Sequence, residues 1–401
     1  MMKEAIQNQT KISVFNKHQT ILLNAAQSLI RNPLRSTSVI LCLIAVLSPF
    51  VTAIAICEGI KFQYANILKE GGDLYVSRDN YGSNAPIELV LSQRFQGIQG
   101  VTRVVPRVIG RTYVKGKFMA VLGIFPSSIP ASIQLILGRE PKAKGEVILG
   151  QRASKSLNLR VGSRFSIDRN PLQTLQIVGL FRSAFSIWEA DLLIMNFEDA
   201  GDLFGIRDEA TDFLIYTRPG YGQIVDKIIS MPEETKKTGA PLRIQTRELI
   251  DRYSQRGFNI KAGVFAAFYM IVFALAIASI AVLSGLSQME RKREIAVMKA
   301  LGWQTQEVLE MVALENLTLS LVSVPLIMVA AVGWVHFFDG AGIAPFFIAG
   351  KNILMPFSIP SRIFPVPFLL CLMMAPILTM TGTLYSTWRT AVVPPAEAMK
   401  K

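Results

Sequence analysis

The sequence predicts a membrane protein with four α-helical spans and one large extracytoplasmic α+β domain between the first and second spans. Only 18% of the 401 residues are charged, against about 25% in soluble domains. Four segments contain no Asp, Glu, Lys or Arg, and each exceeds the roughly 20 residues that a helix needs to cross a membrane: 36–57, 262–289, 316–338 and 363–388. Buried helices of a soluble core have apolar runs of about 10–14 residues, so membrane spans are the better interpretation.

The residues before the first span, 1–36, are expected to be cytoplasmic and to include an amphipathic helix on the membrane surface. Thr20 can cap this helix, and the apolar side chains that follow it recur on one side: Leu22, Ala26, Leu29 and Ile30. A plain helical lead-in to the membrane is the alternative. The first span is predicted over 37–57. Its uncharged run exceeds the roughly 7–15 residues of a signal-peptide core, so we expect a retained anchor.

Residues 58–261 have the mixed texture of a globular domain and are expected to form the extracytoplasmic (periplasmic) α+β domain. Strand-like runs occupy 118–124, 146–149, 164–168, 175–180, 191–195 and 212–216. Helix-like stretches occupy 88–95, 153–159, 221–229 and 246–255. Glycine and proline are expected to separate these elements, as at Gly97, Pro106, Gly110, Gly138 and Pro141. The domain contains none of the three cysteines, so it folds without disulfides.

Three further spans follow this domain and are predicted over 262–288, 312–336 and 364–388. A cytoplasmic coupling segment, 289–311, and a short extracytoplasmic loop, 337–363, join them, and a cytoplasmic tail, 389–401, comes after the fourth span. The second span is rich in small residues, which let helix backbones approach closely. Three of these residues form the candidate dimer interface: Ala274, Ala278 and Gly285.

Lysine and arginine near the ends of short loops determine the orientation of a membrane protein. Here they cluster before the first span, in the coupling segment and in the tail: Lys3, Lys11, Lys17, Arg31, Arg35, Arg291, Lys292, Arg293, Lys299, Arg389, Lys400 and Lys401. The loop 337–363 has only Lys351 and Arg362. Both termini and the coupling segment are therefore expected in the cytoplasm. The long domain is expected outside, because long domains translocate largely regardless of charge.

Signatures of catalysis are missing from the sequence. There is no G-x-x-x-x-G-K-[ST] phosphate loop, so we do not expect this chain to hydrolyse ATP. His18 and His336 stand beside no catalytic triad, and no Cys/His cluster has metal-ligand spacing. The net charge of +13 is not accompanied by a nucleic-acid-binding motif, so the basic surface is expected to face lipid headgroups or an acidic ligand. We expect neither an enzyme nor a cofactor, metal or nucleic-acid site.

The most informative segment is ERKREIAVMKALGW, residues 290–303. Its helical pattern places apolar side chains near one side: Ile295, Met298, Leu301 and Trp303. Gly302 fits a helix stop. A positively charged stop-transfer loop would explain residues 291–293 but not the amphipathic pattern that continues beyond them. A short amphipathic cytoplasmic helix suits docking on a soluble motor.

The longer run MERKREIAVMKALGWQTQEV resembles the signature of the FtsX/MacB-type permease family of ABC transporters, which includes the lipoprotein-releasing permeases. NAAQSLIRNPLRSTSVILCLIAV is similar to the surface helix and first span of this family, and EVILGQRASKSLNLRVGSRFSI to a segment of its periplasmic domain. VVPPAEAMK resembles the Pro-x-Glu-Ala ending of the family. The resemblance covers the whole chain, in the right order.

The resemblance implies the permease subunit of an ABC transporter. Such a subunit transmits the ATP-driven motion of a separate cytoplasmic ATPase to its extracytoplasmic domain, for export or extraction of a lipoprotein, lipid, peptide or drug. ATP is then bound by the ATPase partner. The match places contact with the ATPase on six residues: Glu294, Met298, Lys299, Ala300, Leu301 and Gly302.

The resemblance also implies a multi-pass protein of the cell (inner) membrane that pairs with a second permease, as a homodimer or a heterodimer. Its other implied partners are membrane lipids and a periplasmic adaptor or lipoprotein. The alternative is a mechanotransmitting membrane scaffold that regulates an extracytoplasmic enzyme such as a cell-wall hydrolase. That branch of the family generally has a smaller external domain, so the length of 58–261 favours transport.

Overall fold

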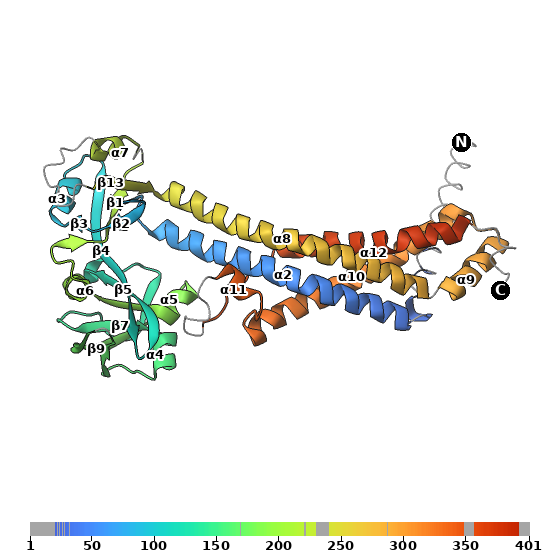
Figure 1. Cartoon of the computed structure of the whole chain (residues 1–401), viewed down its shortest axis with the longest axis horizontal. Helices are drawn as coiled ribbons and strands as arrows, with labels where there is room; N and C mark the ends of the chain where they lie inside the picture. The colour runs from blue at the N-terminus through green and yellow to red at the C-terminus, as the bar shows by residue number, and fades with distance from the viewer. Residues whose placement is uncertain are drawn as a thin grey trace, which may run out of the picture. The chain divides into compact units, whose positions relative to one another are not determined.

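The structure is a computed structural model that describes residues 21–392 apart from 22, 24, 26, 28, 32, 169, 220–221, 230–239, 287 and 349–356 (Figure 1). The chain divides into two compact units. The helical unit comprises Met1–Glu58, Lys261–Ile343 and Ser361–Lys401, and the mixed unit comprises Gly59–Ile260 and Ala344–Pro360. Of the predicted surface helix near the N-terminus, the structure describes residues 21, 23, 25, 27 and 29–31, and all of them are helical, whereas the predicted tail lies largely outside the described residues.

Four helices of the described chain are long and apolar enough to cross a membrane. They are α2 (Pro33–Glu70), α8 (Arg247–Leu286), α10 (Thr305–Phe338) and α12 (Val366–Val392). A large mixed α/β domain lies between the first two in sequence, which confirms the predicted fold class. Two shorter helices lie in the linkers: α9 (Gln288–Ala300) and α11 (Ala344–Phe347).

Two of these helices run well beyond their predicted spans. α2 continues past residue 57 to Glu70, and α8 already begins at Arg247. The prediction of a separate helix over 246–255 is therefore wrong, because those residues are the first part of α8 and Gly257 does not interrupt that helix. The apolar segments of both helices therefore continue without a break into residues of the mixed unit, instead of ending near residues 57 and 262.

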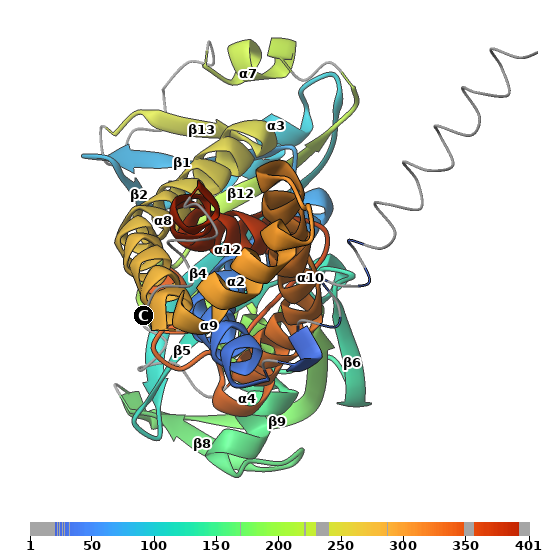
Figure 2. The same cartoon turned by 90° about the vertical axis from the view of Figure 1, so that its right-hand side faces the viewer.

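The four helices pack through one apolar cluster, and Figure 2 shows them end-on. α2 contributes a stripe at helical spacing: Val39, Leu43, Leu47 and Val51. The stripe meets buried side chains of the other three helices: Ile280, Leu319, Ile327, Cys371, Ala375 and Leu378. Gly382 of α12 is needed at one crossing, because a Cβ there would lie 2.8 Å from Ile280 Cγ2 of α8.

A row of buried polar side chains joins α10 to α12. Asn316 Nδ2 donates to Thr383 Oγ1 at 2.5 Å, and the hydroxyl oxygens of Ser320 and Thr379 lie 2.8 Å apart. Glu315, which falls within the predicted third span, is also buried, at 2% exposed. Hydrogen bonds between helices stabilise their association where water is excluded, so this polar row holds the α10–α12 pair together.

The mixed unit is built on a sheet with strand order β13-β1-β12-β4-β5-β10-β7-β9-β6. In chain order these strands are β1 (Leu74–Asn80), β4 (Val101–Val114), β5 (Lys117–Ile124), β6 (Ile133–Gly138), β7 (Glu146–Gly150), β9 (Asn170–Ser183), β10 (Leu192–Asn196), β12 (Asp212–Thr217) and β13 (Leu242–Thr246). β2 (Ser83–Ala85) pairs with β1, β8 (Arg164–Ile167) pairs with β9, and β3 (Ile87–Glu88) pairs with β11 (Glu209–Ala210). The β10–β5 and β7–β9 pairs are parallel, and the others are antiparallel.

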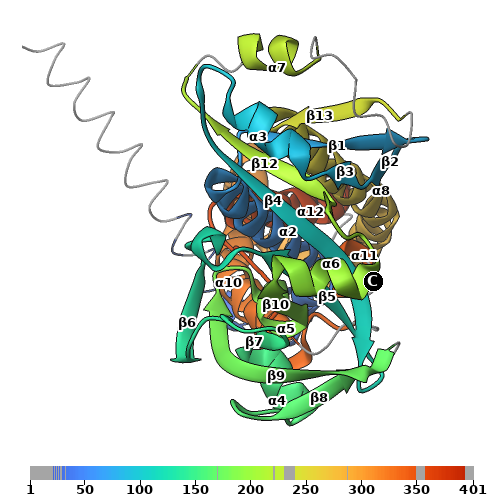
Figure 3. The same cartoon turned by 90° about the vertical axis from the view of Figure 1, so that its left-hand side faces the viewer.

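β4 carries the chain from one half of the sheet to the other (Figure 3). Its residues 101–107 pair with β12 and its residues 108–114 pair with β5. Pro106 and Gly110 therefore lie inside a strand, and the expectation that they separate elements is wrong. Arg107 O accepts from the amide of Thr211 on the β12 side. The nitrogen of Pro106 consequently points to the opposite edge, where its missing hydrogen removes no ladder bond.

Short helices cover the sheet. They are α3 (Val90–Gln96), α4 (Gln151–Leu157), α5 (Ser186–Asp191), α6 (Phe197–Phe204), α7 (Gly222–Ile229) and the 3₁₀ turn η1 (Pro126–Ser128). α6 packs on β4, where Gly110 is required because a Cβ would lie 2.2 Å from the ring of Phe204. The sheet carries a separate apolar cluster that includes Leu122, Phe181 and Ile194.

Candidate functional site

The predicted coupling segment folds as a helical hairpin made of α9 and the first turns of α10. α9 ends at Ala300, and Gly302 adopts a φ of +93°. The amide of Gly302 donates to Lys299 O at 3.0 Å, and the amide of Trp303 donates to Met298 O at 3.1 Å. These two bonds around a left-handed glycine are a Schellman motif. The helix stop predicted at Gly302 is therefore confirmed.

A small apolar cluster holds the two arms of this hairpin together. Ile295 and Val308 form its buried centre, at 4% and 0% exposed, and Met298 and Trp303 pack against them. α10 begins with a capping box at Gln304, which satisfies the first amides of that helix. The hairpin is therefore a defined structural element with its own core.

The six residues assigned to ATPase contact divide into two groups. Three are half-buried: Glu294, Met298 and Lys299. Three are exposed at the tip of the hairpin: Ala300, Leu301 and Gly302. Leu301 is 76% exposed, whereas Met298 belongs to the core of the hairpin. Val297, one turn before Leu301 and 47% exposed, adds a second apolar side chain that the amphipathic pattern did not single out.

The residues assigned to a dimer interface lie on α8, the least enclosed of the four long helices. Only 11% of the apolar 18-residue stretch of α8 is buried, against 61% of the corresponding stretch of α2. Ala276 and Ile280 are buried, whereas Ala274 and Ala278 are exposed on the other side of the helix. Large apolar residues share that exposed side: Phe268, Ile271, Leu275 and Val282. The surroundings of Gly285 fall outside the described side chains.

The junction at which the mixed unit receives α2 and α8 was not predicted from the sequence. Nη2 of Arg247, the first residue of α8, lies 2.9 Å from Asp73 Oδ1 and donates to Gly71 O at 2.7 Å. Gly71 directly follows Glu70, the last residue of α2. Asp73 Oδ2 also accepts from the amide of Thr217 at 2.8 Å. One arginine thus ties the start of α8 to the end of α2, and no sequence motif marks it.

The histidine and acidic side chains of the described residues do not gather into a metal centre. Within it, no group of three or more His, Cys, Asp or Glu residues could hold a metal ion. His336 packs edge-on against Phe337, with ring centroids 5.2 Å apart. His18 lies outside the described residues. These residues therefore provide no second candidate site.

The described chain has four helices long enough to span a membrane, a mixed α/β domain inserted between the first two in sequence, and a capped hairpin between the second and third, which is the element order that the resemblance to membrane permeases implies. Residues 266–395, which include α9, α10 and α12, match the model of the FtsX-like permease C-terminal family. The chain therefore carries an FtsX-like permease domain, which confirms the resemblance of its signature run.

The solved structures that are similar to this chain include domains of two transporter proteins. The periplasmic region of MacB from Actinobacillus actinomycetemcomitans matches at 10% identity and a TM-score of 0.37, over 46% of this chain and 94% of that one. The extracellular domain of the noncanonic ABC-type transporter YknZ from Gram-positive bacteria matches at 14% identity and a TM-score of 0.31, over 39% of this chain and 87% of that one. Curated protein sequences give no match.

Proposed function

We propose that this chain couples ATP hydrolysis in a separate cytoplasmic ABC ATPase to movement of its own mixed unit outside the cytoplasm, in order to export or extract a substrate. The observation that carries the proposal is Leu301, which is 76% exposed at the tip of a hairpin with its own core. An apolar side chain on a pre-organised helical element suits insertion into a groove of a soluble partner. ATP belongs to that partner, and this chain uses no cofactor of its own.

The hairpin follows, in the chain, the helix that is proposed to reach the external domain. α9 begins at Gln288, two positions after the end of α8 at Leu286, and α8 extends as one helix back to Arg247. Arg247 then binds Asp73 and the Gly71 carbonyl at the end of α2. A displacement of the hairpin would therefore pass along a hydrogen-bonded helix to the first residues of the mixed unit, as in a rigid-body switch.

A second permease, identical or related, is proposed to cover the exposed side of α8. Ala274 and Ala278 allow a close approach of two backbones, and the neighbouring Leu275 supplies apolar area. Single cysteines along α8 should then form cross-links between permeases with a helical period. Cross-links without a period would assign this side of α8 to lipid.

The distribution of lysine and arginine supports a cell (inner) membrane protein with both termini and the hairpin in the cytoplasm. A reporter inserted at Gln304 should therefore read cytoplasmic, and one inserted near Gly220 should read external. An external signal at Gln304 would contradict the proposed orientation.

The decisive experiment is Leu301→Asp in the full chain, co-expressed with its ABC ATPase. An unpaired charge buried in a packed contact costs about 3–5 kcal/mol, so the amount of ATPase that co-purifies should fall more than about tenfold. Membrane insertion and the hairpin should persist, because the exposed Leu301 side chain is not part of the Ile295–Val308 cluster.

Two variants serve as controls. Gln306→Asp places the same charge at an exposed position on the first turn of α10, and ATPase binding should stay within about twofold, as for most surface substitutions. Arg291→Ala, on the flank nearer the membrane, should have a smaller effect than Leu301→Asp. Full ATPase binding by Leu301→Asp, or equal losses of ATPase binding in all three variants, would refute the assignment of ATPase contact to Leu301 at the tip of the hairpin.

A further inference from the structure

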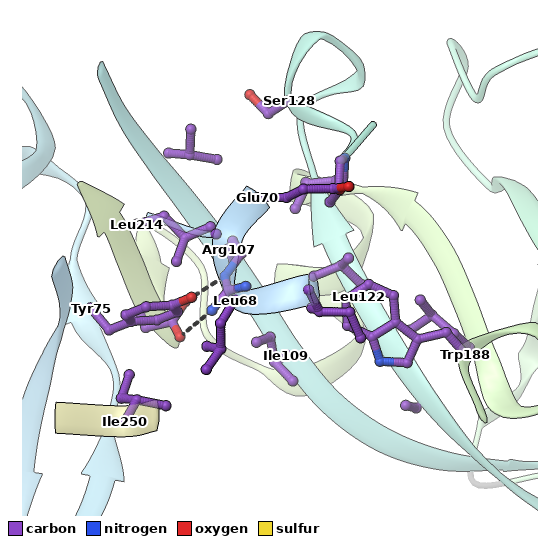
Figure 4. A pocket seen from close by; sticks show the side chains of 18 of the residues that line it. Leu68, Glu70, Tyr75, Arg107, Ile109, Leu122, Ser128, Trp188, Leu214 and Ile250 are labelled. Atoms are coloured by element: carbon purple, nitrogen blue, oxygen red, sulfur yellow. Dashed lines mark hydrogen bonds and ion pairs between the residues drawn. The ribbon is translucent and has the colours of Figure 1, made fainter. Parts of the chain in front are cut away.

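The mixed unit contains a cavity of about 460 Å³ that no sequence motif marks (Figure 4). Its walls come from the outer end of α2, the first turns of α8, the strands β1, β4, β5 and β12, and α5. Small-molecule sites in proteins typically measure about 300–1,000 Å³ and are mostly apolar with a few polar groups. The volume is therefore sufficient for one small molecule or one lipid chain.

The cavity wall is mainly apolar and extends across the strands β1, β12, β4 and β5. Tyr75 and Leu214 lie at one end and Leu122 and Trp188 at the other, with Leu68 of α2 between them (Figure 4). Side chains on one face of a strand alternate with those on the other, and β4 and β5 thus direct alternate residues toward the cavity. An elongated ligand fits this arrangement better than a compact one.

The charges of the cavity wall cancel. Two basic and two acidic residues line it: Arg107, Arg111, Glu70 and Asp212. The guanidinium of Arg107 is occupied by Asp212, to which its Nε and Nη2 donate at 2.9 and 2.7 Å. Arg111 stacks on Phe118, with Cζ 5.1 Å from the ring centroid. A ligand with a net charge would gain little from these groups, so an uncharged ligand is favoured.

One polar group of the wall is buried without a partner. The Oγ of Ser132, a residue that is 9% exposed, has no hydrogen-bond partner among the residues that the structure describes. Its backbone amide is occupied, because it donates to Glu70 Oε2 at 2.8 Å. A buried hydroxyl is normally hydrogen-bonded, and each exception calls for an explanation. The Oγ itself is fully buried, so a rotation of the Ser132 side chain toward the cavity would bring it to a hydroxyl or carbonyl group of a ligand and satisfy it.

We propose that this cavity binds an elongated, uncharged, largely apolar amphiphile, with the apolar body between Leu68 and Trp188 and the hydrogen-bonding end at Ser132. Leu68 and Glu70 belong to α2 and Ile250 belongs to α8, so the ligand contacts both helices that lead to the membrane-spanning segments. That the ligand is the transported substrate rests on the proposed function. The binding of the ligand to the cavity does not rest on that function, and it is measured without the ATPase.

The position of Trp188 allows a direct binding assay on the full chain. The chain has four tryptophans, and Trp188 alone lies in the mixed unit. With Trp303, Trp334 and Trp388 replaced by Phe, its fluorescence reports the cavity. The probe is bromoundecanol, an uncharged chain with bromine at the end opposite the hydroxyl, because bromine quenches tryptophan on contact. We expect saturable quenching of Trp188. Quenching that rises linearly with probe would overturn the proposal.

Two pairs of variants test the position of the ligand. Ala120→Phe fills the cavity and should weaken bromoundecanol more than about tenfold, whereas Val161→Phe, on the surface outside the cavity wall, should not. Ser132→Ala keeps the backbone bond to Glu70 and should weaken bromoundecanol about three- to tenfold, the effect of one hydrogen bond. It should leave bromoundecane, which lacks the hydroxyl, unchanged. Equal binding of bromoundecanol by all variants refutes the site. If Ala120→Phe does not fold, the comparison of Ser132→Ala with the parent chain tests the site instead.

Two further arms identify the ligand. Bromoundecanoate should bind less tightly than bromoundecanol, and tighter binding of the carboxylate would refute an uncharged ligand. In nanodiscs of brominated phosphatidylcholine without added probe, quenching of Trp188 would identify the ligand as a bilayer lipid chain. Quenching by bromoundecanol alone, in unbrominated nanodiscs, would identify it as a free amphiphile. Quenching in neither arm overturns the proposal.

Discussion

Arg247 Nη2 lies 2.9 Å from Asp73 Oδ1, and this ion pair joins the first residue of α8 to the segment between α2 and β1. Charge-assisted hydrogen bonds of this kind are stronger and more directional than neutral ones. Because Arg247 also donates to the carbonyl of Gly71, the two long helices enter the mixed unit at one shared junction. They cannot separate there without breaking these bonds.

The first prediction concerns this junction. Arg247→Ala should raise amide hydrogen exchange in residues 71–75 and 247–250 of the full chain, by an amount equivalent to about 1–3 kcal/mol of local stability. Arg243→Ala is the control, since Arg243 on β13 donates to the Gly82 carbonyl rather than to the end of α2. In Arg243→Ala, amide hydrogen exchange of residues 71–75 and 247–250 should match that of the parent chain. Unchanged exchange in Arg247→Ala would show that the junction is held by other contacts.

The second prediction concerns the turn of the α9–α10 hairpin. Gly302 has a φ of +93°, and no atom lies within 4 Å of the position that an added methyl group would take. Gly302→Ala would therefore act through the backbone alone and should destabilise the turn by about 1 kcal/mol. Gly257→Ala, inside α8 and equally free of neighbours, should stabilise its helix by about 0.5–1 kcal/mol. Amide hydrogen exchange should therefore rise around residue 302 in Gly302→Ala and fall around residue 257 in Gly257→Ala. A change of the same sign would contradict the Schellman geometry.

The third prediction concerns pH. Burial raises the pKa of Asp191 from 3.8 to about 6, although Arg111 opposes the rise. The folded state thus favours the protonated carboxyl. The contribution of the protonated Asp191 carboxyl to the stability of the folded state is complete below about pH 3.8 and is lost as the pH rises through about 6. Asp191→Asn should remove this dependence and stabilise the mixed unit at pH 7 by at most about 3 kcal/mol.

Thermal unfolding of the full chain with Trp303, Trp334 and Trp388 replaced by Phe, followed through Trp188 fluorescence, measures this effect. Glu146→Gln is the control of opposite sign, because the hydrogen bond from Arg139 lowers the pKa of Glu146 to about 2. The parent chain should lose the Glu146 contribution only as the pH falls from about 4.5 toward 2. A flat difference between Asp191→Asn and the parent from pH 4 to 6 would contradict the assignment.

The fourth prediction concerns the polar row between α10 and α12. Ser320→Ala removes the hydroxyl that lies 2.8 Å from Thr379 Oγ1 of the facing helix and should cost about 0.6–1.7 kcal/mol of helix association. Ser323 is equally buried but donates within α10, to Leu319 O, so Ser323→Ala should be nearly neutral. Unfolding by titration with sodium dodecyl sulfate measures both. Equal costs would mean that the contact between the helices contributes nothing.

Much of the mixed α/β domain was within reach of sequence patterns. The strand-like runs at 118–124, 146–149 and 164–168 correspond closely to β5, β7 and β8, because each combines apolar residues with a clear turn on either side. β4 was missed, since Pro106 and Gly110 are normally breakers. Their use in β4 depends on β12 and on Phe204 of α6, which are distant in sequence.

The sequence alone determined the four spans and the helix stop at Gly302, because these depend on local properties. A long uncharged run is stable only where its backbone bonds are satisfied away from water, and a left-handed turn favours glycine. The tertiary structure alone decided that Met298 faces inward while Leu301 is exposed. It likewise decided that Arg247 joins two helices, and that Glu70 and Ser132 meet at a cavity. These relationships join residues far apart in the chain, so they exist only once folding brings those residues together.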